Sequence, residues 1–436
     1  MPVPEAVSRA YPPTGVARFA ALAFLVLIAT LPWSIAPMSI AVIVCITLTL
    51  AVAWIGRDIR SLNSPVILPG LGWLAALAIA ALVGRSGVWH PLTKAFLVLL
   101  VPVAAINARA EEAGRRATAV LFISAALATI FALTSFVAHG GAFPARVRGA
   151  VGHPVTYGGQ VLLLTSLAFA FAVRARERRW RVGAMSLLAL LVPALLGSYT
   201  RSAWLGVLAA MALIVGLTRA RWLIGLAVAV AIVFAALPSA YKARALSSFD
   251  ASSPWNVERV RMWEAGLRMF SDHPIVGVGL RDFGAVYDRY RSPDSIERAG
   301  HLHSVWIHVA ATMGLVGLGA LGWLVTGLFR AAGRGLRVKR GNEALSEDGG
   351  RGWFPATLQI GILAGLVGFL VAGFFEWNFG DEELLDLLYT LVGLAFAATT
   401  WRIAPGTTPG QGRTPLRFHR MMMNLPTCLP RSVSTE

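Results

Sequence analysis

Three histidines stand at the start of an apolar, glycine-containing stretch, GHLHSVWIHVAATMGLVGLG (residues 300–319). A free imidazole has a pKa near about 6.5, so a histidine can accept a proton from a hydroxyl group at neutral pH. Ionisable residues are rare in segments that cross a bilayer, and those present often have a function. His303 is therefore the candidate catalytic base. The alternative is a histidine at the membrane interface in front of an ordinary packing helix.

The same stretch contains two glycines at helical spacing. Gly314 and Gly317 are three residues apart, so a continuous helix would place them on one face. Small residues allow a second helix to approach closely within a membrane. The spacing predicts a helix-packing face behind His303.

Arginine is found in three further segments between apolar runs: SYTRSAWLG with Arg201, RVRGAVGHP with Arg148 and His153, and NVERVRMWEAGLRMF with Arg259 and Arg261. The planar guanidinium group presents its donors in a rigid fork, which suits phosphate. Each arginine taken alone could instead extend to lipid headgroups or lie on the solvated face of a surface helix.

A carboxylate and an amide, Glu376 and Asn378, lie in the segment FFEWNFGDEE (374–383). Glu376 could be the buried partner of one of the arginines. The sequence has no pair of carboxylates at a suitable place for a glycosidase. The chain contains no HExxH, CxxC, P-loop or dinucleotide motif, and Cys45 and Cys428 form no metal-ligand pattern. The sequence predicts neither a metal nor a cofactor.

The composition indicates which elements must position these residues. Of the 436 residues, 56% are hydrophobic and 14% are charged, with a mean hydropathy of +0.65. Soluble domains are about 45–50% apolar and about 25% charged. We therefore expect an all-α polytopic membrane protein.

Twelve apolar runs are long enough, or nearly so, to cross a bilayer: 16–34, 36–55, 66–84, 94–108, 117–138, 156–173, 182–198, 203–218, 221–238, 304–329, 355–375 and 384–401. The short connections rich in arginine alternate with connections poor in arginine, which predicts that both termini are cytoplasmic. The net charge of +17 then reflects mainly cytoplasmic loops and one long outer loop, so nucleic-acid binding is not expected.

This topology predicts four regions. Nine spans occupy residues 1–238, and residues 239–302 form a long periplasmic segment with an amphipathic helix. Three further spans occupy residues 303–404, and residues 405–436 form a cytoplasmic tail that is expected to be disordered. The candidate arginines, His303 and Glu376 then all lie at the outer face, where they would suit a doubly charged anion carried in the bilayer.

The stretch HSVWIHVAATMGLVG resembles the pattern H-[N/S/Q]-nine residues-G-two residues-[G/T/Y] of O-antigen ligases, with His303, Ser304, Gly314 and Gly317 at the patterned positions. The arginine of YTRSAWLG, the R-G…HP segment and the E-x-N segment are also similar to that superfamily. The resemblance covers roughly residues 140–395, whereas the first five spans are similar only in being hydrophobic.

The resemblance implies an inner-membrane glycosyltransferase that needs neither metal nor nucleotide. Such enzymes move a glycan from undecaprenyl pyrophosphate to an acceptor on the periplasmic side, and in the ligases the acceptor is a sugar of lipid A–core. The family's histidine corresponds to His303. Its two arginines correspond to Arg201 and to Arg261, with Arg259 nearly as good a match. Arg148 is a further candidate for phosphate, and His153, Glu376 and Asn378 would support the site.

Other functions remain open on the sequence. An O-antigen polymerase or a protein O-oligosaccharyltransferase of the same superfamily would use the same residues. A transporter of lipid-linked glycans would more often place charges in the middle of its spans and contain internal repeats. The sequence has neither feature, so an enzyme acting at the membrane interface is favoured.

Overall fold

Helices occupy every apolar run of the sequence. The computed structural model describes residues 15–84, 94–141, 145–280, 282–334, 336 and 352–401, and these residues contain no strand. The described helices all belong to the unit Met1–Trp401. The expected tail, residues 405–436, lies outside the described part of the chain.

In chain order the helices are α1 (Gly15–Thr30), α2 (Ile35–Ile55), η2 (Ile59–Leu62), α3 (Ile67–Gly84), η3 (Ala95–Leu99), α5 (Leu100–Asn107), α6 (Glu111–Ala138), α7 (Pro154–Arg174), α8 (Arg178–Gly197), α9 (Arg201–Arg219), η4 (Ala220–Trp222), α10 (Leu223–Ala236), α11 (Ser239–Leu246), α12 (Pro254–Asp272), α13 (Phe283–Tyr290), α14 (Val305–Gly333), α15 (Trp353–Ala372), η6 (Asn378–Gly380) and α16 (Glu382–Ala398).

Eight helical segments in the described part of the chain are long and apolar enough to cross a membrane, counting Arg201–Ala236 as one. Gly15–Thr30 and Ala95–Asn107 are apolar but shorter. The predicted class, an all-α polytopic membrane protein, is confirmed. The number of twelve spans stays a prediction.

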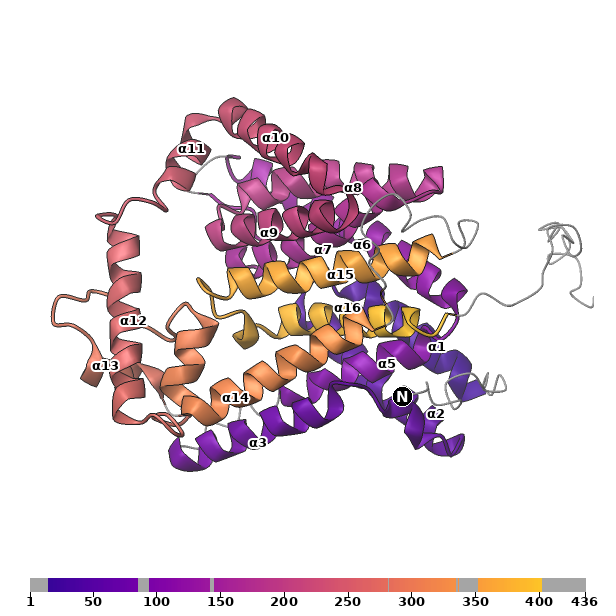
Figure 1. Cartoon of the computed structure of the whole chain (residues 1–436), viewed down its shortest axis with the longest axis horizontal. Coiled ribbons are helices and arrows are strands. Elements are labelled where there is room, and N and C mark those ends of the chain that lie inside the picture. The colour runs from indigo at the N-terminus through magenta and orange to yellow at the C-terminus, as the bar shows by residue number, and fades with distance from the viewer. Residues whose placement is uncertain are drawn as a thin grey trace, which may run out of the picture. The chain divides into compact units, whose positions relative to one another are not determined.

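Helices α15 and α16 form the centre of the bundle. Figure 1 shows them between α9 on one side and α14 with α3 on the other. Almost all side chains of α16 are buried, although it begins with two glutamates. The segment that joins α15 to α16, residues 373–381, therefore emerges at the middle of one end of the bundle.

Two glycines fix the position of α9 against α15. A Cβ atom at Gly206 would lie 2.5 Å from the carbonyl oxygen of Gly368, and one at Gly368 would lie 2.5 Å from that of Gly206. Small residues permit this close approach of two helix backbones. Arg201 begins α9 and Glu376 follows α15, so this contact helps to hold both side chains at the same end of the bundle.

The segment between α10 and α14 contains three short or amphipathic helices. Helix α12 lies where the sequence predicted an amphipathic helix, and it stands across the end of the bundle in Figure 1. Its residues Met262, Ala265 and Met269 are buried together with Tyr287 and Leu302. This small apolar cluster attaches α12 to the residues that lead into α14.

The predicted packing face of Gly314 and Gly317 is wrong, because α14 is broken at Gly314. Gly314 has φ 60° and ψ −154°, which is not helical. A Cβ atom there would lie 2.5 Å from the backbone of Ile275. The glycine is needed because residues 274–279 insert their own backbone into the break.

Backbone hydrogen bonds seal this break: Val278 N to Ala311 O (2.9 Å), Gly279 N to Thr312 O (3.0 Å), Leu315 N to Pro274 O (2.8 Å) and Val316 N to Ile275 O (3.1 Å). Unpaired backbone groups are costly within a membrane, so a non-helical segment there needs such partners. The loop that follows α12 thereby becomes part of the packing of α14.

Candidate active site

His303 lies in the turn that leads into α14. Its φ of 46° is unusual for a residue with a side chain and is held by neighbours. The indole Nε1 of Trp263 donates to the carbonyl of Leu302 (3.1 Å), and the His303 amide donates to Nδ1 of His301 (3.3 Å). The His303 side chain is 33% exposed, so a substrate can reach the ring.

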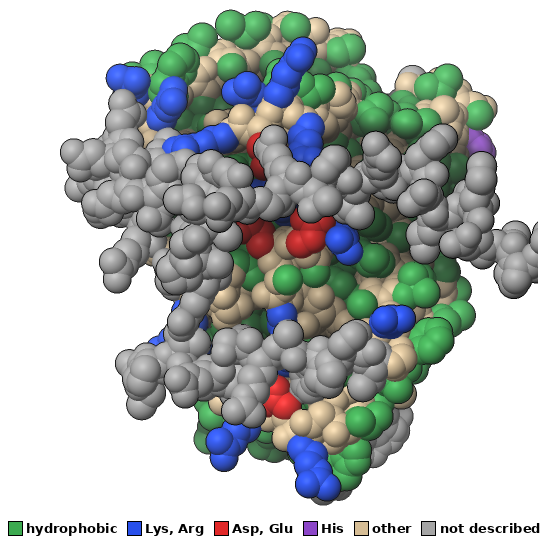
Figure 2. Space-filling model, turned by 90° about the vertical axis from the view of Figure 1, so that its right-hand side faces the viewer, with side chains coloured by type: hydrophobic (Ala, Val, Ile, Leu, Met, Phe, Trp, Pro, Cys, Tyr) green, Lys and Arg blue, Asp and Glu red, His purple; other side chains and the backbone are tan. Residues whose placement is uncertain are grey.

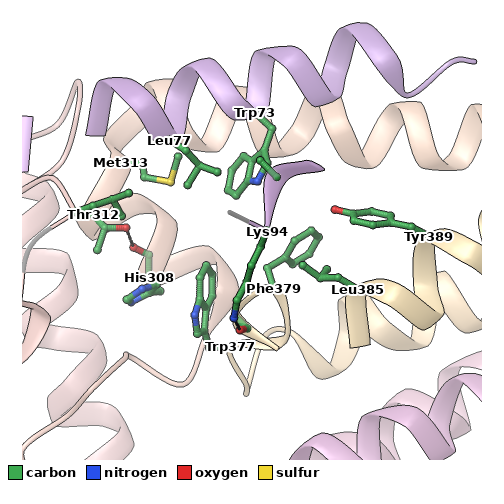
Figure 3. Close-up of a pocket in the computed structure, with 13 residues that line it drawn as sticks. Trp73, Leu77, Lys94, His308, Thr312, Met313, Trp377, Phe379, Leu385 and Tyr389 are labelled. Atoms are coloured by element: carbon green, nitrogen blue, oxygen red, sulfur yellow. Dashed lines mark hydrogen bonds between the residues drawn. The ribbon is translucent and has the colours of Figure 1, made fainter. Parts of the chain in front are cut away.

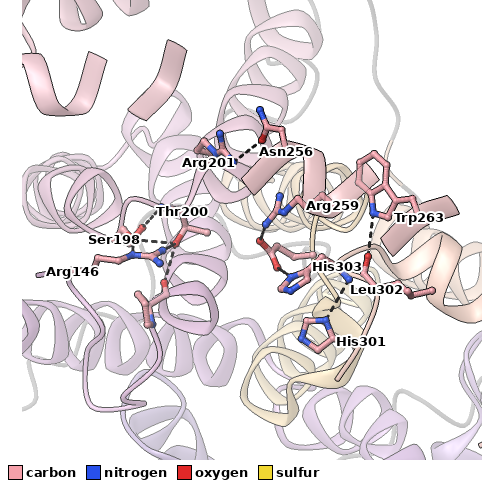
Figure 4. Close-up of polar contacts among 12 residues, drawn as sticks. Arg146, Ser198, Thr200, Arg201, Asn256, Arg259, Trp263, His301, Leu302 and His303 are labelled. Atoms are coloured by element: carbon pink, nitrogen blue, oxygen red, sulfur yellow. Dashed lines mark hydrogen bonds and ion pairs between the residues drawn. The ribbon is translucent and has the colours of Figure 1, made fainter. Parts of the chain in front are cut away.

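One carboxylate joins His303 to an arginine of α12. Glu376 Oε2 lies 3.1 Å from Nδ1 of His303, and its Oε1 lies 2.7 Å from Nη2 of Arg259 (Figure 4). Glu376 is itself buried. Burial alone would raise the pKa of Glu376, but the hydrogen bond with His303 and the charge of Arg259 bring that pKa below its ordinary value. The carboxylate is therefore ionised at neutral pH.

Arg201 faces this group from the start of α9. Its Nη1 donates to Oγ of Ser247 (3.1 Å) and its Nη2 donates to Oδ1 of Asn256 (3.1 Å). Both acceptors are neutral, and both belong to the segment between α10 and α14. Asn256 in turn donates to the Ser247 carbonyl (2.7 Å). The guanidinium group is thus positioned by neutral partners that leave its charge available.

Two arginines that the sequence did not single out complete the cluster. Arg146 donates from Nε to the carbonyl of Ser198 (2.7 Å) and from Nη2 to Oγ1 of Thr200 (3.1 Å). Burial lowers the pKa of Arg146, and the charge of Arg244 lowers it further. Burial also lowers the pKa of Arg244, followed by the charge of Arg259. Nε of Arg244 is buried and has no hydrogen-bond partner in the described part of the chain.

We call the set Arg146, Arg201, Arg244 and Arg259 the arginine cluster. Glu376 is the carboxylate whose charge acts on each of Arg146, Arg201 and Arg244. The four guanidinium groups repel one another and exceed the charge of this one carboxylate. Such an arrangement favours the binding of an anion with more than one negative charge.

Arg148, a predicted phosphate ligand, does not join the arginine cluster. Its side chain is exposed, and Arg146, two residues earlier, makes the contacts with Ser198 and Thr200. Gly149 follows in the left-handed region (φ 57°) and begins a turn towards α7. Residues on both sides of this turn lie against the start of α9, since Oγ1 of Thr200 also donates to the carbonyl of Pro154 (3.0 Å), but Arg148 makes neither contact.

Arg261 does not join the cluster either. Its Nη1 donates to Oε1 of Glu258 (2.6 Å) and to the carbonyl of Asp294 (2.8 Å). Residues two apart on a helix lie about 200° apart around its axis, so Arg259 and Arg261 face opposite ways. The sequence preferred Arg261, but the geometry of α12 directs Arg259 to Glu376.

The remaining predicted site residues are Ser304, Asn378, His153 and Gly317, and each lies at or within a described helix or turn. Ser304 caps α14, where its hydroxyl accepts from the amide of Ile307 (3.5 Å). Asn378 is buried and donates to the carbonyl of Phe369 (2.9 Å), which holds the Glu376 segment against the end of α15. His153 is exposed at the start of α7, and Gly317 is buried within α14.

His301 is a further residue of the site. Its ring meets the His303 ring edge-on, with centroids 4.3 Å apart. Burial lowers the pKa of His301 to about 4, and the charge of His303 is the next cause. His301 is therefore neutral at pH 7 and can accept the hydrogen bond from the His303 amide. The HLH spacing of the two histidines was the signal for it, whereas nothing in the sequence separated Arg244 from the other basic residues of its loop.

Fold and site together define a multi-pass membrane protein with a basic, histidine-containing site at one end of its helical bundle. Residues 186–322 match the family model described as O-antigen ligase. The match supports membership of the O-antigen ligase superfamily and confirms the resemblance seen in the sequence. The matched region includes Arg201, Arg259 and His303, whereas Arg146 and Glu376 lie outside it. No curated protein sequence matches the chain significantly.

Proposed function

We propose that the protein is a bacterial inner-membrane glycosyltransferase, an O-antigen ligase. It moves O-antigen polysaccharide from undecaprenyl pyrophosphate to a sugar of lipid A–core on the periplasmic side and so completes lipopolysaccharide. The observation that carries the proposal is the contact of His303 with Glu376, which also binds Arg259 beside the rest of the arginine cluster. The family match over this region supports the choice of chemistry.

His303 acts as the base that activates the acceptor. Glu376 accepts a hydrogen bond from Nδ1 of the ring, so the lone pair that remains for the substrate is on Nε2. A carboxylate partner of this kind fixes the orientation of an imidazole and increases its basicity. Nε2 takes the proton of the acceptor hydroxyl as its oxygen attacks the sugar.

The arginine cluster binds the pyrophosphate of the donor. Negative charge grows on this group as its bond to the sugar breaks, and preorganised cations stabilise that charge where water is excluded. Arg201 is held by neutral acceptors, and Nε of Arg244 is buried without a partner among the described residues, so both can turn donors towards phosphate oxygens. Arg259 is shared between Glu376 and the ligand.

The reaction is a direct displacement at the anomeric carbon. The acceptor oxygen forms a bond to that carbon, and the bond between the carbon and the pyrophosphate oxygen breaks. Pyrophosphate leaves on its lipid with the electron pair, and the acceptor proton goes to His303. A single displacement inverts the anomeric centre, and the residues of the site perform these steps without a metal or nucleotide.

The arrangement of charges supports a periplasmic site with both termini in the cytoplasm. Figure 2 views the end of the bundle that is remote from α12 in Figure 1, and Lys and Arg side chains are spread over its described surface. Basic residues of short loops are retained on the cytoplasmic side of a membrane. His303 and the arginine cluster then belong to the periplasmic end.

Reconstitution with the purified protein tests the function. The wild-type chain is placed in vesicles with undecaprenyl-pyrophosphate glycan and lipid A–core. Glycan attached to lipid A–core supports a ligase. Longer lipid-linked chains indicate a polymerase, glycan on an added protein indicates an oligosaccharyltransferase, and donor that changes leaflet without reacting indicates a transporter. Each of these last three outcomes refutes the ligase.

His303→Ala is the matched test of the chemistry. We expect the variant to insert and fold and to lose transfer by about 10²- to 10⁴-fold, the usual contribution of a general base. His273→Ala changes an exposed histidine at the end of α12 and serves as the control. A folded His303→Ala protein with normal transfer would remove the proposed base.

A further inference from the structure

A cavity borders Trp377, the residue after Glu376, and no member of the arginine cluster is among its lining residues. It has a volume of about 140 Å³ and is formed by α3, η3, α14, η6 and α16 (Figure 3). Cavities near about 150 Å³ accept a single six-membered ring. The family resemblance assigned no role to the side chains that line it.

Aromatic rings form much of the wall. Trp73 and Phe379 lie with ring centroids 6.4 Å apart, and the rings of Trp377 and His308 meet at an angle of 57° with centroids 4.4 Å apart. Tyr389 directs its hydroxyl group towards Trp73 and Lys94 (Figure 3). Flat apolar walls suit the C–H faces of a pyranose ring, since ligand pockets combine aromatic surface with a few convergent polar groups.

Polar groups at the cavity can form hydrogen bonds with the hydroxyl groups of a sugar. His308 lines the cavity, and its buried Nδ1 has no hydrogen-bond partner among the described residues. A buried polar atom without a partner is costly, and a bound ligand would relieve that cost. Lys94 donates to the carbonyl of Gly380 and has two further protons to offer.

The charge of the cavity differs from that of the arginine cluster. The positive charge of Lys94 lies close enough to Asp381 and Asp386 to act on both carboxyl groups. Lys94 therefore has the acidic group of Asp381 close by, whereas the arginine cluster carries an excess of positive charge. A phosphate would bind in the cluster, and an uncharged polyhydroxylated ring fits the cavity.

The position of the cavity indicates which sugar it holds. In Figure 1, α9 and α11 lie on one side of α15 and α16, and α3 and α14 lie on the other. Trp377 follows Glu376 directly, and His308 lies one turn beyond Ser304, to whose carbonyl its amide donates (2.9 Å). In a direct displacement the attacking group approaches opposite the leaving group. A ring on the side of α3 and α14 is therefore on the acceptor side.

We propose that the cavity lined by Trp73, Trp377, His308 and Tyr389 binds the uncharged sugar ring of the acceptor. The proposal rests on the proposed function, because it assigns the arginine cluster to the donor pyrophosphate. The aromatic walls hold the ring, and His308, Lys94 and Tyr389 bind its hydroxyl groups.

Two cavity variants and one control test this subsite. Trp73→Leu removes one aromatic wall, and Tyr389→Phe removes a single hydroxyl group with little risk to folding. Trp54→Leu changes a tryptophan of α2 that is 74% exposed and serves as the control. Each protein is assayed for the KM of acceptor and of donor, and for binding of delipidated core oligosaccharide in the absence of donor.

We expect Trp73→Leu to raise the acceptor KM and the oligosaccharide Kd by roughly tenfold or more, with a smaller rise for Tyr389→Phe. The donor KM should be unchanged, and Trp54→Leu should match the wild type. Unchanged acceptor KM and Kd in both folded cavity variants would refute the subsite. An increase in donor KM alone would assign the cavity to the donor sugar and equally refute the proposal.

The binding measurement separates this proposal from the proposed function. A wild-type protein that binds the oligosaccharide, loses that binding in the cavity variants and still forms no product would refute the ligase function while supporting the sugar site. If both cavity variants form product with normal acceptor kinetics, that result would support the ligase function and refute the sugar site.

Discussion

Nδ1 of His303 lies 3.1 Å from Oε2 of Glu376, although the two residues are 73 positions apart in the chain. The amide of Val305 also donates to the carbonyl of Gly373 (2.8 Å), which joins the first turn of α14 to the end of α15. The histidine and its carboxylate are therefore held by a backbone contact as well as by their own hydrogen bond.

Glu376→Gln tests the importance of the carboxylate charge. Glutamine keeps the shape but presents a neutral group to His303 and leaves Arg259 without its ion pair. We expect kcat to fall by about 10- to 100-fold, the usual effect of removing a partner that orients a histidine. Transfer is measured at saturating donor and acceptor. Glu264→Gln, on the exposed side of α12, is the control, and equal kcat values for the two variants would argue against the role of Glu376.

Arg259 and Arg261 can be separated by lysine substitutions. Lysine keeps the charge but loses the fork that binds two oxygens at once. We expect Arg259→Lys to lower kcat/KM for the donor by roughly 10- to 100-fold, in line with the loss of a charge-assisted hydrogen bond. Arg261→Lys should stay within about threefold of the wild type, because Arg261 is engaged by Glu258. The opposite order would restore Arg261 as the phosphate ligand.

Arg244 is one of the two arginines that the structure rather than the sequence adds to the site. Its Nε is buried without a partner in the described structure, which leaves a donor for an incoming phosphate. We expect Arg244→Gln to raise the donor KM by about tenfold. Lys242→Gln, on the same helix, is the matched control for loss of one positive charge from this segment. A similar donor KM in both variants would mean that Arg244 acts only through its positive charge and does not bind the phosphate directly.

Gly314→Ala tests the break in α14. Alanine would have to adopt a positive φ and place its Cβ against the backbone of Ile275. We expect a loss of at least roughly 3 kcal/mol in the free energy of unfolding, seen as little folded protein and a lowered Tm. A Cβ at Gly319 of the same helix meets no atom of the described structure within 4 Å, so Gly319→Ala should change stability by less than about 1 kcal/mol. Equal stability of the two variants would contradict the described break.

His301 predicts a pH dependence of stability. Burial lowers its pKa from 6.5 in the free side chain to about 4 in the folded protein. The unfolded chain therefore binds the extra proton first, and stability falls as pH decreases from 6.5 towards 4. The loss amounts to at most roughly 3 kcal/mol.

Replacing His301 should flatten this dependence. We expect His301→Gln to lose less stability than the wild type when Tm is measured in detergent between about pH 7 and about pH 5. His139→Gln, at the exposed end of α6, should behave as the wild type. An unchanged slope in His301→Gln would mean that another group controls acid unfolding.

The sequence predicted the helices, the membrane class and the amphipathic helix because each depends on local hydrophobic patterns. It also selected His303, Glu376 and Arg201, which structure brings to one end of the bundle. It preferred Arg261 to Arg259, whereas the rotation of α12 about its axis, which the sequence does not give, directs Arg259 to Glu376. Nor could it choose Arg146 over Arg148, since that depends on where a loop turns.

The break at Gly314 shows a different limit. The spacing of Gly314 and Gly317 fits a packing face only if the helix is continuous, and the sequence alone did not indicate a break. Its cause is the loop of residues 274–279, which bonds to both sides of Gly314. The helical periodicity of one segment carries no information about a backbone from another segment that hydrogen-bonds to it.

This inserted loop has a consequence for biogenesis. Gly314 lies nine residues into α14, about 14 Å from its head, where a nascent span would leave amide and carbonyl groups without partners. Residues 274–279 are made before α14, so the partner is already present when the span emerges from the ribosome. We therefore expect completion of the span and docking of the loop that follows α12 to be one cooperative event, so that a chain that fails to dock the loop also fails to mature in the membrane.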